Sequence, residues 1–130
     1  MTDASFVAAF EAGRLGPSEF HHRDHVRLAW ILVRRDGLER GGDHVAHGIR
    51  AFAVRHGVAD RYHETITRFW IRLVGHAVAA APDAAFEELV ERFPILLDAA
   101  AITRHWSRDA LQRPEARAQW LEPDLAPLSG

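Results

Sequence analysis

The sequence contains no cysteine, which excludes disulfides, zinc–thiolate sites, iron–sulfur clusters and thiol nucleophiles. It also contains no lysine: all sixteen basic residues are arginine, so no lysine is available as a Schiff base or general base. The formal net charge of −2 gives no excess of positive charge for nucleic acid or a membrane surface. Carboxylates, hydroxyls and nine histidines are left to carry any chemistry.

Long hydrophobic runs are missing as well. The longest unbroken apolar run covers residues 28–33, far short of the roughly 20 residues that a membrane helix needs. Asp3 lies where a signal peptide would carry positive charge. We therefore expect a soluble, cytoplasmic protein with neither nucleic acid nor a membrane as partner.

The 130 residues are enough for one hydrophobic core, and we expect one domain over residues 1–130. Apolar residues recur every three to four positions, and no segment shows the alternation of a strand, which predicts an all-α bundle of five to seven helices. Capping residues, glycines and prolines predict helices over residues 3–12, 18–35, 43–57, 60–80, 83–93, 95–112 (one or two short ones) and 115–121. The helix over 18–35 is apolar over the widest arc, so we expect it at the centre. Residues 122–130, with Pro123 and Pro127, should form an extended tail.

Two histidine clusters stand out. In the first, His22 and His25 are three residues apart, so on a helix they share a face that continues into apolar residues. His21 and His25 form an alternative pair four residues apart. Because buried imidazoles need partners, a metal ion is one explanation for such a pair.

The second cluster is the segment Y-H-E-T-I-T over residues 62–67. With Asp60 as the helix cap, His63 falls in the first turn and on the buried face. Glu64 lies at the edge of that face, where it either turns inward or pairs with Arg68. Thr67 lies one turn below His63 and could hold a water molecule or orient a ligand group.

Together, His22, His25 and His63 would form a three-nitrogen site for one divalent transition metal, with zinc, iron, copper and nickel not distinguished. Glu64 and Thr67 would handle protons or water, and Trp30 and Trp70 would form walls around the bound molecule. This arrangement predicts a small metal-dependent enzyme acting on a small organic molecule, with hydrolysis and oxidation both left open.

Two alternatives remain open. The same residues could form a non-catalytic helical module that binds a small molecule or a metal, or a metal-free buried polar network. The apolar helices and the proline-containing end could instead form the interface of a dimeric interaction protein.

The segments F-H-H-x-x-H-V-x-x-A-W (residues 20–30) and Y-H-E-T-I-T (residues 62–67) resemble those of an uncharacterised family of small bacterial helical proteins. The similarity extends to the proline-containing ending over residues 122–128. It implies no activity, but it does imply that this ending belongs to the folded unit.

Overall fold

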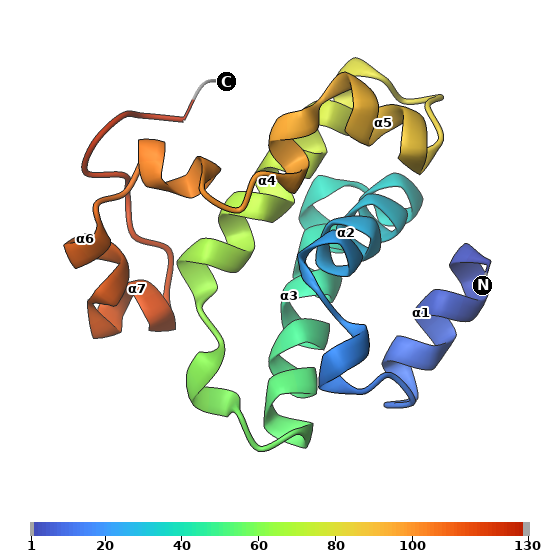
Figure 1. Cartoon of the computed structure of the whole chain (residues 1–130), viewed down its shortest axis with the longest axis horizontal. Coiled ribbons are helices and arrows are strands. Elements are labelled where there is room, and N and C mark those ends of the chain that lie inside the picture. The colour runs from blue at the N-terminus through green and yellow to red at the C-terminus, as the bar shows by residue number, and fades with distance from the viewer. Residues whose placement is uncertain (1, 129–130) are drawn as a thin grey trace.

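The computed structural model describes residues 2–128, and all regular structure in this range is helical (Figure 1). It contains seven α-helices: α1 (Asp3–Glu11), α2 (His22–Asp36), α3 (Leu38–Arg55), α4 (Glu64–Ala80), α5 (Phe86–Arg92), α6 (Arg108–Gln112) and α7 (Pro114–Ala118). Short 3₁₀ helices lie between them: η1 (Pro17–Glu19), η2 (Ala59–Arg61), η3 (Pro94–Leu97) and η4 (Ala101–Arg104). The predicted all-α class is confirmed. No helix in the described range is both long and apolar enough to cross a bilayer.

Helix α2 lies at the centre of the larger hydrophobic core, as its wide apolar arc predicts. It packs along α3 and against α4, while α1 and α5 cover other parts of its surface (Figure 1). Its buried side chains include Val26, Leu28 and Leu32, which are almost completely inaccessible to solvent. The helix begins at His22 rather than residue 18, because residues 17–19 form the separate turn η1.

The prediction that the third helix begins with Asp43 as its cap is wrong, since α3 already begins at Leu38. Gly41 and Gly42 lie inside this helix instead of breaking it. A Cβ atom at Gly41 would lie 2.3 Å from the carbonyl oxygen of Leu32, so glycine is what lets α3 approach the backbone of α2 this closely. The cost of glycine in a helix interior, about 1 kcal/mol relative to alanine, is offset by this packing.

Helix α4 also begins later than expected. Asp60 belongs to η2, and the residue that caps α4 is His63, whose extended backbone precedes Glu64. An imidazole nitrogen replaces the usual carboxylate or hydroxyl oxygen as the capping acceptor.

A second hydrophobic core joins α4 to the C-terminal part of the chain. Trp106 and Phe69 are buried there with their rings in edge contact, 5.5 Å between centroids. The chain after α7 is extended and follows this core, with Trp106 Nε1 donating to the carbonyl of Leu121 (2.9 Å) and the Leu125 amide donating to the carbonyl of His105 (2.9 Å). The predicted tail over residues 122–128 thus contains no helix and bends at residues 124–126, whereas residues 129–130 lie outside the described range.

Candidate functional site

A cavity of about 320 Å³ lies between α2, α3, α4 and the segment that leads into α4. The three predicted ligands His22, His25 and His63 all line it, although they come from segments about forty positions apart. The full set of lining residues is His22, His25, Ala29, Val45, Ile49, Arg61, Tyr62, His63, Ile66, Thr67, Trp70 and Ile71.

Both ring nitrogens of His63 are occupied by the main chain. Nδ1 accepts from the amide of Ile66 (3.2 Å), and Nε2 lies 2.7 Å from the carbonyl oxygen of Leu111. Because a carbonyl can only accept, Nε2 carries the proton and the ring is neutral. Burial lowers the pKa of His63, with Arg117 adding to this and the bond to Leu111 opposing it. His63 is therefore a helix cap and a link to the C-terminal segment.

His22 has one nitrogen engaged in the same way. Its Nε2 lies 2.9 Å from the carbonyl oxygen of Leu96 in η3, so Nε2 is the donor and Nδ1 keeps an acceptor lone pair when the ring is neutral. The edge of the ring meets Trp70, with ring centroids 4.4 Å apart. These two contacts fix the orientation of the imidazole at one side of the cavity.

His25 is half-buried between Phe20 and the cavity. Burial lowers its pKa from 6.5 to about 4, the neighbouring His22 adds to this effect, and Asp24 and a hydrogen bond with the carbonyl of Phe20 oppose it. Its ring lies against Phe20, with 4.2 Å between centroids. His25 is thus neutral at physiological pH, with one nitrogen engaged by the main chain.

The prediction of a metal-dependent enzyme is wrong. Although the three histidines share one cavity, nowhere in residues 2–128 do three or more His, Cys, Asp or Glu side chains form a group that could hold a metal ion. The physical reason is clearest at His63, where both nitrogens already serve main-chain partners and none is left for a metal. His21, the alternative ligand, is exposed outside the cavity, and its amide donates to Asp24.

Glu64 takes the second of the two roles open to it and pairs with Arg68. One carboxylate oxygen accepts from Arg68 Nε (2.9 Å) and the other from the Tyr62 hydroxyl (2.5 Å). Burial and the contacts with Glu64 raise the pKa of Tyr62 well above its ordinary value, while a hydrogen bond with Thr67 opposes this. Tyr62 is therefore a neutral phenol that donates to Glu64, and Glu64 does not line the cavity.

The remaining predicted site residues do not all lie at the same cavity. Thr67 and Trp70 line the cavity with the histidines, whereas Trp30 lies at a different depression between α1 and α2. Trp30 and Trp70 both lie near the histidine-bearing face of their helices in the sequence. The tertiary packing decides which cavity each indole meets: Trp30 lines the depression between α1 and α2, and Trp70 lines the histidine cavity.

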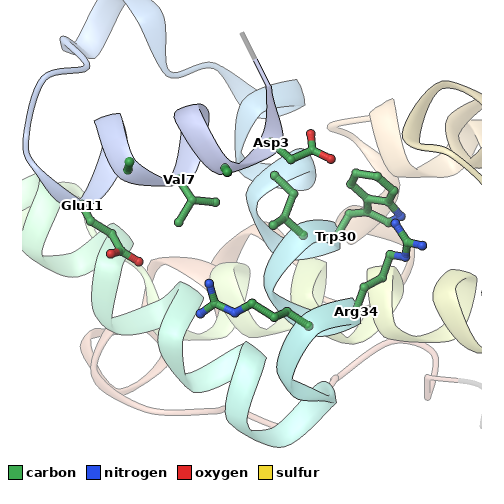
Figure 2. A pocket seen from close by; sticks show the side chains of 9 residues that line it. Asp3, Val7, Glu11, Trp30 and Arg34 are labelled. Carbon is green, nitrogen blue, oxygen red and sulfur yellow. The ribbon is translucent and has the colours of Figure 1, made fainter.

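The depression at Trp30 is larger, about 540 Å³, and more open (Figure 2). The guanidinium of Arg34 lies over the Trp30 ring, 4.7 Å from its centroid (Figure 2). The other charged residues of this depression form the pairs Asp3 with Arg27, Glu11 with His44, and Arg35 with Asp36. Because these charged groups are already paired, this depression has fewer groups available to bind a ligand than the histidine cavity has.

Sequence reasoning missed several lining residues, four of which lie outside the two helices that carry the predicted site. Val45 and Ile49 form one wall from α3, and Arg61 and Tyr62 lie at the entry to α4. The spacing of Val45 and Ile49 marks them as neighbours on a helix face, but not as neighbours of the histidines. Only the glycine-mediated approach of α3 to α2 brings them there.

No family model, curated protein or solved structure matches this chain. The resemblance of the two histidine segments to a bacterial family therefore stays a prediction.

Proposed function

We propose that the protein is a metal-free helical module that binds a small organic molecule in the cavity between α2, α3 and α4. The observation that carries the proposal is the composition of this cavity. Its walls are largely apolar, formed by Ala29, Val45, Ile49, Ile66 and Ile71, and a few polar groups converge on them from two helices. Such apolar concavities with a small number of oriented polar groups are typical of small-molecule sites.

The volume supports a compact ligand. A dry cavity of about 150 Å³ is large enough to hold benzene. A space of about 320 Å³ therefore suits a substituted ring or a bicyclic molecule such as indole. The half-buried indole ring of Trp70 offers a matching aromatic surface at the wall.

Binding is better supported than a reaction, because Glu64, the carboxylate expected to move protons, is engaged within the protein and does not line the cavity. Both nitrogens of His63 and both oxygens of Glu64 have partners within the protein. A general base needs an unengaged lone pair within reach of the proton that it removes.

The proposal is tested by ligand-observed NMR with indole, phenol, benzoate and hexanoate as probes. Ile66→Trp fills the cavity, whereas Ala8→Trp adds the same side chain in the depression between α1 and α2 and is the matched control. We expect at least one probe to bind wild type and Ala8→Trp alike and to lose binding in Ile66→Trp.

Circular dichroism and thermal unfolding establish that each variant is folded, and Ile49→Trp replaces Ile66→Trp if the latter is not. The proposal is overturned if no probe binds the wild-type protein, or if binding persists unchanged in a folded cavity-filling variant.

A further inference from the structure

We infer that the ligand of this cavity is a small cyclic carboxylate that carries a hydrogen-bond donor at the end opposite its carboxylate group. This inference rests on the proposed function and adds the chemical class of the ligand. It follows from the distribution of charge, donors and acceptors around the cavity.

The first observation is an unbalanced positive charge. Arg61 lines the cavity and is exposed to solvent, and its guanidinium has no hydrogen-bond or ion-pair partner among the residues that the structure describes. No aspartate or glutamate belongs to the described lining. Guanidinium groups bind carboxylates through two parallel hydrogen bonds, so Arg61 is suited to hold an anionic group at the entrance.

The second observation is an excess of acceptors away from Arg61. His22 gives Nε2 to the carbonyl of Leu96 and keeps Nδ1 for a ligand, and His25, which burial holds neutral, gives one nitrogen to the main chain and keeps the other as an acceptor. The nearby donor of Tyr62 is already used by Glu64. A ligand hydroxyl or amine would supply the missing donor.

The third observation is the surface between these two ends. Ile66 and Trp70 follow Arg61 along the chain on α4 and line the cavity, and the ring of Trp70 meets His22, so apolar and aromatic groups extend from the side of the arginine toward that imidazole. A ring is the simplest ligand body for this surface, because it covers apolar area with few rotatable bonds to immobilise. A hydroxylated or aminated cyclic acid meets all three requirements.

Isothermal titration with three probes of nearly equal size separates these contributions at pH 7. 4-Hydroxybenzoate has both groups, 4-hydroxybenzamide replaces the anion by a neutral amide, and benzoate lacks the donor. We expect 4-hydroxybenzoate to bind about tenfold more tightly than either of the others, since each missing partner leaves a polar group of the protein unsatisfied.

Arg61→Gln should abolish the preference for the acid over the amide while leaving affinity for the amide within about twofold. Arg40→Gln, which removes the same charge from an exposed position on α3 outside the cavity, should keep the preference. Added salt should weaken binding of the acid and leave binding of the amide unchanged.

The inference is overturned if acid and amide bind wild type equally, if benzoate equals 4-hydroxybenzoate, or if Arg61→Gln and Arg40→Gln behave alike. If Ile66→Trp still abolishes binding in those cases, the proposed function is retained although the inference about the ligand class is wrong. If none of the three probes binds the wild-type protein, the inference is also overturned, and the NMR panel decides the proposed function separately.

Discussion

At the scale of single residues, the histidines of the cavity differ in what their nitrogens do. His63 uses both nitrogens to cap α4 and to reach the carbonyl of Leu111, and His25 is kept neutral by burial. The same residue type therefore serves as a structural link in one place and as an available acceptor in another. Each role has its own measurable consequence.

Replacement of His63 separates its two hydrogen bonds. His63→Ala removes the cap and the bond to Leu111, and we expect the free energy of unfolding to fall by about 2 kcal/mol, with each bond contributing about 1 kcal/mol. His63→Asn keeps a good N-cap residue and should recover about half of this loss. Urea unfolding measures both, and equal stabilities of the two variants would contradict the double role.

His25 predicts a specific loss of stability in acid. Its pKa is about 4 in the folded protein and 6.5 when unfolded, so below pH 6.5 the unfolded chain takes up a proton that the folded protein does not. The free energy of unfolding should therefore fall between pH 6.5 and 4, by about 3 kcal/mol from this group. Above pH 6.5 this residue should cause no change.

Urea unfolding of wild type and His25→Leu at several pH values isolates this contribution, because acid-sensitive carboxylates are common to both proteins. Between pH 6.5 and 4, the free energy of unfolding should fall more steeply with decreasing pH in wild type than in His25→Leu. Parallel pH profiles would show that His25 is accessible to protons in the folded state.

At the scale of helices, the approach of α3 to α2 is set by a residue that lacks a side chain. A Cβ at Gly41 would meet backbone atoms of Leu32 and Val33 within 2.8 Å, and backbone cannot move aside as a side chain can. This contact also positions Val45 and Ile49 at the cavity. Gly41 and Gly42, which in the sequence are typical of a break between helices, thus lie inside α3, where Gly41 serves its packing on α2.

Gly41→Ala should lower the free energy of unfolding by about 2 kcal/mol despite the better helix propensity of alanine, because overpacking outweighs it. Gly75→Ala in α4 is the matched control. There the added Cβ meets only the side chain of Leu38, which is half exposed and can rotate away. We expect the control to be neutral or stabilising by thermal unfolding, and equal effects of both substitutions would refute the packing argument.

At the scale of the whole molecule, one hydroxyl joins α4 to the C-terminal segment. Thr65 is completely buried, and its Oγ1 donates to the carbonyl of Ala116 (2.7 Å) and accepts from the amide of Leu121 (3.1 Å). Together with Trp106, it binds the extended residues after α7 to the rest of the protein. This segment is therefore part of the fold.

Thr65→Val removes the hydroxyl at almost constant volume and leaves two buried main-chain groups without their partner. We expect a loss of about 1–3 kcal/mol in the free energy of unfolding and faster hydrogen exchange at the Leu121 amide. Thr65→Ser, which keeps the hydroxyl, should retain the slow exchange. Unchanged exchange in Thr65→Val would mean that the segment is held by its other hydrogen bonds and its packing, without a contribution from the Thr65 hydroxyl.

Local pattern in the sequence determined the helical class, the central position of α2 and the two histidine segments, because the period of apolar residues reports which face of a helix is buried. Tertiary structure alone decided what the histidines can do. The partners of His22 and His63 are carbonyls 74 and 48 positions away, and no local rule connects residues that distant. Whether a buried imidazole has a free nitrogen depends on which main-chain groups packing brings beside it, and at His63 packing gives both nitrogens to the main chain instead of to the expected metal site.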